Sequence, residues 1–242
     1  MVILALDTSS AAGSAAVARD GVVLVEREGD GTRTHGERLP RELMTILEEA
    51  GVALRDVDRF AVATGPGSFT GLRVGIATIQ GLALAQHKLV VPVSSFDALA
   101  SVCQRTSNVE SRTSELIAVW IDAHRGEVFG CLYDSDARTM VQPPSSRAPD
   151  ATLGMWARAI DGHCRVQFAG DGAIKYAESI RARLGQHAVI PSSVPSLAGK
   201  IASIAAAEPQ RAVVPHAVVP LYVRRPDAEL ARDRKAAPKA TP

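Results

Sequence analysis

The N-terminal stretch VILALDTSSAAGSAAVARDGVVLVERE, residues 2–28, predicts three short β-strands in direct succession. Its apolar runs are separated by a Ser/Gly-rich turn and by the dipeptide Asp20-Gly21, which is a strong signal for a β-hairpin. The expected strands cover residues 2–8, 12–19 and 22–28. This stretch therefore predicts the antiparallel part of a sheet.

Helical and strand patterns alternate after this stretch. Residues 37–50 place their large apolar side chains on one face of a helix. The side chains on that face are Leu39, Leu43, Ile46, Leu47 and Ala50. The pattern continues with a strand at 58–63, a helix at 71–86, a strand at 89–93 and a helix at 95–104.

The second half of the chain repeats this order of elements. Its expected elements are strands at 115–122 and 127–134, a weak third strand at 138–142, a helix at 151–161, a strand at 165–169, a helix at 173–184, a short strand at 187–190 and a helix at 194–207. Asp7 and Asp122 end matching strands, and Phe60-Ala-Val-Ala-Thr-Gly-Pro-Gly67 is echoed by Val166-Gln-Phe-Ala-Gly-Asp-Gly172.

A βββαβαβα unit made twice is the plan of the actin/Hsp70/sugar-kinase superfamily, whose core is ribonuclease-H-like. The expected fold class is therefore α/β with two lobes. The N-terminal lobe is expected at 1–106, with helix 194–207 packing back on it, and the C-terminal lobe at 113–192. Residues 223–242 carry six basic and three acidic side chains without apolar periodicity, and a disordered tail is expected at 226–242.

The amino-acid composition argues against several classes of function. The hydrophobic content of 46% with 22% charged residues is typical of a soluble globular protein. A net charge of +1 and an aromatic content of 4% argue against a protein that binds nucleic acid by itself. The apolar runs are too short to span a membrane. Three widely spaced cysteines without a CxxC pair favour reduced thiols and a cytoplasmic location.

The sharpest local motif is the glycine loop at 65–75, GPGSFTGLRVG, which follows an apolar strand and opens a helix. Such a loop either binds an anion at the helix N-terminus or simply lets the backbone pass close to a neighbouring element. Asp7 and the residues after it could likewise hold Mg²⁺ and phosphate or form a turn between strands. The candidate nucleotide or anion site therefore comprises Asp7, Thr8, Ser9, Gly65, Gly67, Ser68, Thr70 and Gly71.

The matching loop of the second half, Gly170-Asp171-Gly172, has a carboxylate where a second phosphate would approach. That charge would repel the ligand unless a metal intervened. A nucleotide site in this chain is expected to be only half built.

The glycine loop, together with Ala5-Leu-Asp-Thr-Ser-Ser10, strongly resembles the TsaB (YeaZ) family. Further matches are Asp122-Ala-His-Arg-Gly-Glu-Val-Phe129, Phe168-Ala-Gly-Asp-Gly172 and Pro220-Leu-Tyr-Val-Arg-Arg-Pro226. The resemblance covers nearly the whole chain apart from the tail.

The resemblance implies a non-catalytic subunit that binds and activates TsaD, the related enzyme that places threonylcarbamoyl on the adenosine beside the anticodon of tRNA. The ATPase TsaE would complete the assembly, and tRNA would be reached through the complex. The chain is expected to carry no cofactor of its own, with any ATP or ADP and Mg²⁺ at the interface between subunits. It is expected to form a homodimer when alone.

The residues agree with a non-catalytic role. TsaD-like enzymes carry two metal-binding histidines one turn apart, and the matching positions here are Ser95 and Leu99, neither of which is a histidine. No two of the six histidines are four residues apart, and no GxSxG elbow is present. The sequence therefore predicts neither catalytic nor metal-binding residues. The alternative is an autonomous ATPase or small-molecule kinase of the same fold, which the glycine loop and Asp7 would serve.

The two helices at 37–50 and 71–86 either pack only into their own lobe or present a partner surface. The partner surface is the expected one, because the second helix is apolar nearly all round. The expected interface residues are Leu39, Leu43, Met44, Leu47, Leu72, Val74 and Thr78. The resemblance places the same helices of TsaD against them. On this hypothesis Leu43→Arg or Val74→Arg would leave the monomer folded and abolish pairing.

Overall fold

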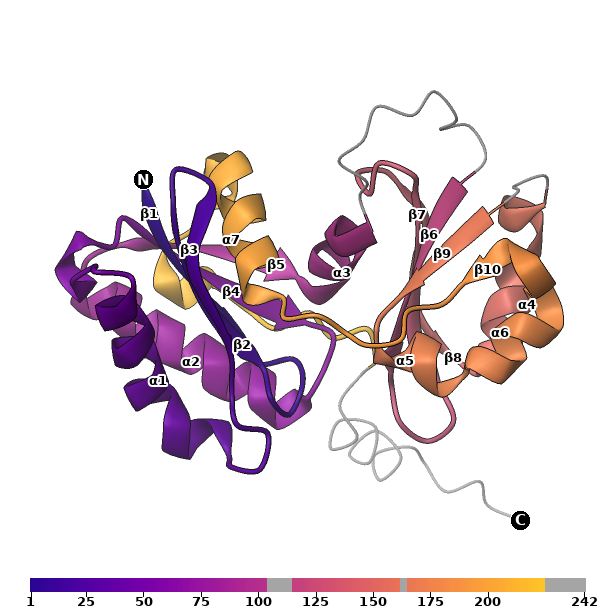
Figure 1. Ribbon diagram of the computed structural model, residues 1–242, viewed down its shortest axis with the longest axis horizontal. Helices are drawn as coiled ribbons and strands as arrows, with labels where there is room; N and C mark the ends of the chain where they lie inside the picture. The colour runs from indigo at the N-terminus through magenta and orange to yellow at the C-terminus, as the bar shows by residue number, and fades with distance from the viewer. Residues whose placement is uncertain (104–114, 162–164, 225–242) are drawn as a thin grey trace, which may run out of the picture.

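The chain folds into two five-stranded mixed sheets, each flanked by helices (Figure 1). The computed structural model describes residues 1–103, 115–161 and 165–224. Sheet A has the strand order β3-β2-β1-β4-β5 and sheet B the order β10-β9-β6-β7-β8. The expected tail at 226–242 lies outside the described residues, so its predicted disorder stays a prediction.

The described residues contain ten strands and seven α-helices. Sheet A contains β1 (Val2–Asp7), β2 (Ser14–Arg19), β3 (Val22–Glu28), β4 (Arg59–Gly65) and β5 (Leu89–Ser94). Sheet B contains β6 (Glu115–Asp122), β7 (Val128–Asp134), β8 (Met140–Arg147), β9 (Arg165–Ala169) and β10 (Ala188–Val189). The helices are α1 (His35–Glu49), α2 (Phe69–Ala85), α3 (Ser95–Cys103), α4 (Pro149–Ile160), α5 (Asp171–Lys175), α6 (Ala177–Leu184) and α7 (Ala198–Ala207).

The predicted duplication is confirmed by the strand order. β1, β2 and β3 pair antiparallel, and β1, β4 and β5 pair parallel; β6 to β10 repeat the same scheme. Gly65 ends β4 with a φ of 102°, and Gly170 follows β9 with a φ of 96°. Both glycines adopt a backbone conformation that L-residues rarely reach, at equivalent places in the two halves.

Helices cover both faces of each sheet. α1 and α2 lie side by side on the outer face of sheet A, and α4 and α6 cover the outer face of sheet B (Figure 1). α7 packs against β1 and β2, and α3 contacts β6 and β9 of the other sheet. Each half therefore sends its last helix towards the sheet of the other half, and α3 packs against both lobes.

One apolar cluster joins the two lobes. It contains buried residues of both sheets, such as Ile3 and Val93 in sheet A and Val119 and Cys131 in sheet B, together with residues of α3 and α7. A second cluster lies between sheet A and helices α1 and α2, and a third lies beneath α4 and α6. Because burial of apolar surface is the main stabilising term in folding, the shared cluster holds the lobes together.

The last helix begins four residues later than the sequence pattern indicates. The N–H groups of Leu197 and Ala198 donate to the Ser14 hydroxyl at 3.1 and 3.0 Å, and that of Gly199 donates to Glu26 Oε1 at 2.8 Å. Side chains from β2 and β3 thus satisfy N–H groups that a helix cannot pair internally. Because this cap is made by residues far away in the sequence, the residues around position 198 do not predict where the helix begins.

Two further elements differ from expectation. β8 extends to residue 147, although it contains Pro143 and Pro144, because it is the edge strand of sheet B and its free edge needs no proline N–H. The helix expected at 173–184 is two helices, α5 and α6, which meet at Tyr176. No helix within the described ranges has the length and apolar content that crossing a bilayer requires.

Candidate functional site

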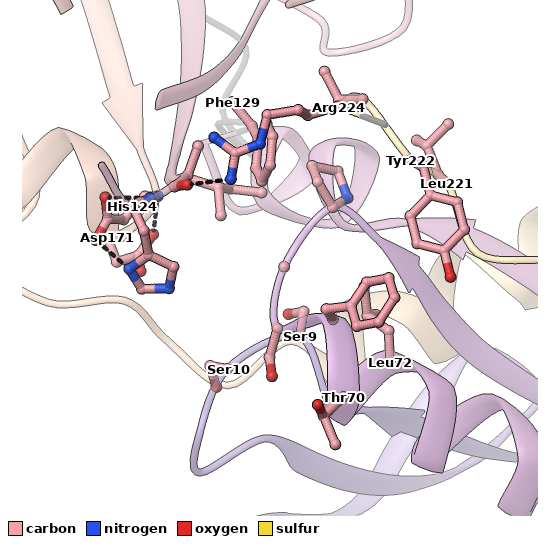
Figure 2. Close-up of a pocket in the computed structure, with 18 of the residues that line it drawn as sticks. Ser9, Ser10, Thr70, Leu72, His124, Phe129, Asp171, Leu221, Tyr222 and Arg224 are labelled. Atoms are coloured by element: carbon pink, nitrogen blue, oxygen red, sulfur yellow. Dashed lines mark hydrogen bonds and ion pairs between the residues drawn. The ribbon is translucent and has the colours of Figure 1, made fainter. Parts of the chain in front are cut away.

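A cleft of about 700 Å³ opens between the lobes (Figure 2). Its size falls in the range typical of small-molecule pockets. The N-terminal lobe provides the wall that contains Ser9, Ser10, Ala11, Pro66, Gly67, Ser68, Phe69, Thr70 and Leu72. The C-terminal lobe and the last described residues provide Ile121, Asp122, Ala123, His124, Phe129, Asp171, Leu221, Tyr222, Val223 and Arg224.

The glycine loop forms a capped helix start that packs against the end of β1. The Ser68 hydroxyl accepts the N–H of Gly71 at 3.2 Å, and the Ser68 N–H donates to the Ser9 carbonyl at 2.7 Å. A Cβ at Gly71 would lie 2.3 Å from the Thr8 carbonyl oxygen, and one at Gly67 would lie 2.5 Å from that of Ser9. The glycines are therefore required for close approach of α2 to β1, whether or not the loop binds an anion.

The eight residues of the predicted anion site come together where the glycine loop packs against the end of β1, but they form two layers. The four that line the cleft are Ser9, Gly67, Ser68 and Thr70. The four that lie buried behind them are Asp7, Thr8, Gly65 and Gly71. Only the first layer can touch a ligand in the cleft, and anion binding there stays a prediction.

Asp7 is buried at the end of β1, and its Oδ1 accepts the N–H of Ser9 at 2.8 Å. Burial raises the pKa of this carboxyl, against the lowering effects of the Ser9 hydrogen bond and of His35. The matching Asp122 of the second half accepts the N–H of His124 at 3.1 Å. Both aspartates thus form the turn after their strand, as one of the two sequence readings proposed.

The C-terminal wall of the cleft carries carboxylates that are already engaged. Asp171 Oδ1 accepts the N–H groups of Asp122 and Gly172 at 3.0 and 2.9 Å, and Lys175 Nζ lies 2.7 Å from Asp122 Oδ2. If the C-terminal lobe had an anion site equivalent to the one predicted in the N-terminal lobe, these N–H groups would bind the anion. The carboxylate of Asp171 occupies them instead, so this wall is poorly suited to a phosphate.

The last described residues cross from one lobe to the other above the cleft (Figure 2). The Leu221 N–H donates to the Thr64 carbonyl at 2.8 Å. The Arg224 guanidinium donates to Glu127 and to the Ala123 carbonyl, both at 3.0 Å, on the opposite lobe. The sequence motif around Pro220 was noted only for its resemblance, and no role was expected for Tyr222 or Arg224.

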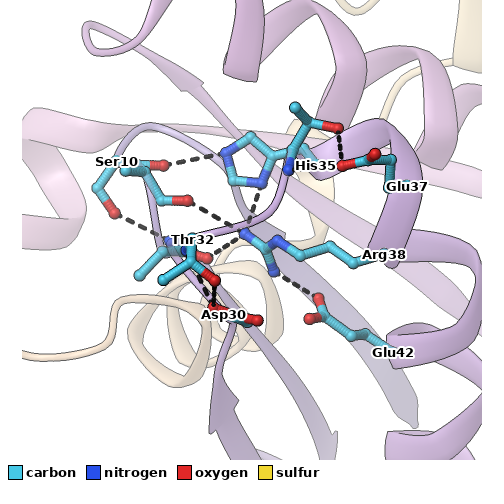
Figure 3. A network of polar contacts seen from close by, with 11 residues as sticks. Ser10, Asp30, Thr32, His35, Glu37, Arg38 and Glu42 are labelled. Atoms are coloured by element: carbon cyan, nitrogen blue, oxygen red, sulfur yellow. Dashed lines mark hydrogen bonds and ion pairs between the residues drawn. The ribbon is translucent and has the colours of Figure 1, made fainter.

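A buried arginine organises the loop between β1 and β2 (Figure 3). Arg38 is 4% exposed and donates to Glu42 at 2.5 Å, to the Ala11 carbonyl at 3.2 Å and to the Ala12 carbonyl. It also lies 2.7 Å from His35 Nδ1, while His35 Nε2 lies 3.0 Å from the Ser10 carbonyl. The network fixes the rim of the cleft to the first turn of α1, and the apolar pattern of that helix gave no sign of it.

The stability of the fold is expected to decline as the pH falls below about 6.5, the ordinary pKa of histidine. Burial and the Arg38 guanidinium lower the pKa of His35, whereas the Ser10 carbonyl, Asp7 and Glu42 oppose this effect. The unfolded chain therefore takes up the proton first, and stability present above the ordinary pKa is lost towards the lowered one. Urea denaturation at pH 7.5 and 5.5 should show this loss, and it should shrink in His35→Gln, which cannot titrate. An equal loss in both proteins would assign the effect to other groups.

The positions that match the metal ligands of TsaD-like enzymes are not exposed to the cleft. Ser95 is fully buried in the first turn of α3, and Leu99 is 3% exposed at the contact with the C-terminal lobe. In the described parts of the chain, no three His, Cys, Asp or Glu side chains are grouped so as to hold a metal ion. Burial raises the pKa of the Cys103 thiol to about 11 and that of Cys131 to about 12, so both are poor nucleophiles at neutral pH.

Comparison with known proteins shows which proteins this chain resembles. A family model described as TsaD, tRNA N6-adenosine threonylcarbamoyltransferase, matches residues 29–219. The solved structure of YeaZ from Pseudomonas aeruginosa is 30% identical, with a TM-score of 0.71 over 91% of this chain and 99% of that one. The chain belongs to the TsaB (YeaZ) family.

Two curated members carry the name tRNA threonylcarbamoyladenosine biosynthesis protein TsaB. The Bacillus subtilis protein is 28% identical over 95% of this chain and 96% of its own length. The Escherichia coli protein is 38% identical over 56% of this chain and 56% of its own length. The resemblance drawn from the glycine loop is thereby confirmed, and the TsaB family connects this fold with tRNA threonylcarbamoyladenosine biosynthesis.

The structure of this TsaB-family chain corrects the expected partner surface. Four of the seven expected interface residues are at most 3% exposed and belong to the protein's own core, so they are unavailable to a partner. These four are Leu39, Leu43, Leu47 and Leu72. Met44 is 36% exposed, and Val74 and Thr78 are half-buried. The sequence pattern identified the buried stripe of each helix, which is the face that carries most of the apolar residues.

Proposed function

We propose that this chain is a non-catalytic subunit that docks on a TsaD-type transferase and supports its transfer of threonylcarbamoyl to the adenosine beside the anticodon of tRNA. In this role it contributes a surface and no reacting group. TsaE would join the same assembly, and tRNA would be held by the complex as a whole. Family membership supports the pathway, and the surface of α2 supports the role.

The observation that carries this proposal is the composition of the solvent-facing side of α2. Arg73 is the only charged residue in its 17 positions. The exposed residues are Phe69, Thr70, Arg73, Ala77, Gly81, Leu84 and Ala85. A helix on the outside of a sheet normally presents a polar face to water, so a helix with this outer face is typical of an interface.

The small residues at the centre of this face favour a helix as the partner. Ala77 and Gly81 lie one turn apart, and a Cβ at Gly81 would meet no atom within 4 Å. Small side chains let two helices approach closely, and the exposed Met44 of the adjacent α1 can pack on the edge of such a contact. A pair of helices from a protein of the same fold would suit this face.

The cleft supports a role without chemistry of its own. An autonomous ATPase or kinase needs both phosphate-binding walls, but Asp171 fills the donor positions of one wall. The two cysteines whose surroundings the structure describes are buried thiols with raised pKa values. Titration of the isolated chain with Mg-ATP is accordingly expected to give no sub-micromolar affinity, and such an affinity would favour the kinase alternative.

Ala77→Arg is expected to leave the fold intact and to weaken binding to TsaD by roughly 100-fold or more, because it forces a charge into the centre of the contact. Met155→Arg is the matched control, since Met155 is 38% exposed on α4 of the other lobe. The binding constant and the rate of tRNA modification are measured in a reconstituted mixture of TsaD, TsaE and this chain. Modification by this chain unaided, or wild-type pairing by Ala77→Arg, would contradict the proposal.

A further inference from the structure

Three side chains form an exposed cluster at the N-terminal end of α2. The rings of Phe69 and Tyr222 lie 5.7 Å apart between centroids, at an angle of 35°. The Arg73 guanidinium lies over the Phe69 ring, 3.9 Å from its centroid, and Arg73 Nε donates to the Tyr222 hydroxyl at 3.1 Å. Phe69 and Tyr222 are nevertheless 44% and 40% exposed. We call these three residues the aromatic–arginine cluster.

The cluster continues the outer face of α2 onto the C-terminal segment, residues 212–224. Gln80 Nε2 donates to the carbonyls of Pro215 and Val218 at 2.9 and 3.0 Å, so this segment runs along α2. The segment carries four of the molecule's exposed large apolar side chains. They are Val214, Val219, Leu221 and Tyr222, which are between 38% and 68% exposed. The apolar surface around α2 is therefore wider than the two helices alone.

Arg73 differs from three other arginines of the described chain in its contacts. Arg38, Arg211 and Arg224 each form an ion pair with a carboxylate. Within the described ranges no carboxylate lies at ion-pair distance from Arg73, whose contacts are an aromatic face and a hydroxyl. A guanidinium that loses its water in an interface is costly unless a carboxylate meets it. The orientation imposed by Phe69 and Tyr222 reduces the side-chain entropy lost when such a pair forms.

From this geometry we infer that the aromatic–arginine cluster anchors the partner subunit, which places a carboxylate against Arg73 and an apolar side chain against Tyr222. This inference rests on the proposed function, because the occupant is the TsaD-type subunit docked on α2. Tyrosine and arginine are the residue types that most often dominate interface energetics. The cluster fixes one end of α2 against the partner and so sets the register of the helix contact.

The geometry disfavours the two other occupants that this chemistry could suit. A single-stranded nucleic acid would need a free aromatic face on which to stack a base, but Arg73 covers one face of Phe69 and Tyr222 lies against the same ring. A second copy of this chain would bring another Arg73 against the first, and α2 itself supplies no carboxylate to meet either of them; a carboxylate could come only from another element such as α1. Both occupants appear as outcomes of the test.

The test measures the affinity of the full-length chain for purified TsaD at two salt concentrations. Arg73→Glu is expected to weaken binding by about 100-fold and Arg73→Gln by about 30-fold. Arg73→Gln should lose much of the salt dependence of the affinity, whereas Arg73→Glu should reverse it, because salt then screens a repulsion between two carboxylates. Tyr222→Phe removes only the hydroxyl contact and is expected to cost about threefold, whereas Tyr222→Ala should cost at least tenfold. Met155→Glu is the control, and circular dichroism with thermal denaturation verifies that each variant is folded.

The outcomes separate this inference from the proposal on which it rests. Loss of pairing in Ala77→Arg with wild-type affinity in Arg73→Glu would overturn the anchor and leave the docking face in place. Wild-type affinity in both would overturn the proposed function as well. A change confined to self-association would make a second copy the occupant, and a change confined to tRNA affinity would make it RNA. Each of these last two results would overturn the anchor.

Discussion

Gly71→Ala is expected to destabilise the protein by about 2–3 kcal/mol, although alanine is the better helix former by about 1 kcal/mol. Its Cβ would lie 2.3 Å from the Thr8 carbonyl oxygen and 3.2 Å from His35 Cδ2. Thr8 directly follows β1, whose last residues pair with β2 and β4, so its carbonyl has little freedom to move aside. The first turn of α2 must therefore shift away from β1, and the cleft wall shifts with it.

Gly81→Ala is the matched control for this prediction. Gly81 lies in the same helix, but nothing lies within 4 Å of the Cβ that alanine would add. This substitution should stabilise the protein by about 0.5–1 kcal/mol through helix propensity alone. Urea denaturation of both variants measures the difference. Equal and small effects would show that α2 does not depend on close approach to β1.

Leu43→Arg is expected to abolish folding, with a loss of about 5 kcal/mol or more. Leu43 is 0% exposed within the cluster beneath α1 and α2. Loss of a buried leucine costs about 2–5 kcal/mol, and an unpaired buried charge adds to it. That sum rivals the total stability of a typical domain. The variant should be recovered as aggregate or as a chain without a cooperative unfolding transition.

Met44→Arg is the control for Leu43→Arg, because it places the same charge at an exposed position of the same helix. Met44 is the next residue on α1 and is 36% exposed, so its replacement should cost less than about 1 kcal/mol. A folded Leu43→Arg protein would contradict the packing described for α1. The sequence hypothesis expected that variant to fold, and the burial of Leu43 argues against it. Helical periodicity identifies an apolar stripe without saying whether the stripe faces the core or a partner.

The cleft and the outer helices suggest how the function is divided between two surfaces. The cleft retains the general plan of a ligand site, but its second wall is closed by Asp171 and it is crossed by the C-terminal segment. The outer face of α2 carries a single charged residue, Arg73. On the proposed function, the fold would serve as a rigid support for the docking face while the cleft carries out no reaction of its own.

The α/β class, the duplicated order of elements and the family could all be predicted from the amino-acid sequence. These features depend on local periodicity, turn signals and short motifs, all of which act within a few residues of one another. The glycine loop also located the junction of β1 and α2, because closely spaced glycines mark a place where backbones must approach.

Which residues are exposed to other molecules depends instead on how the helices and sheets pack together. The start of α7 depends on Ser14 and Glu26, which are more than 170 residues away along the chain. The aromatic–arginine cluster likewise joins Arg73 to Tyr222, 149 positions apart. Periodicity cannot report such contacts, because they depend on which faces meet after the helices and sheets have packed.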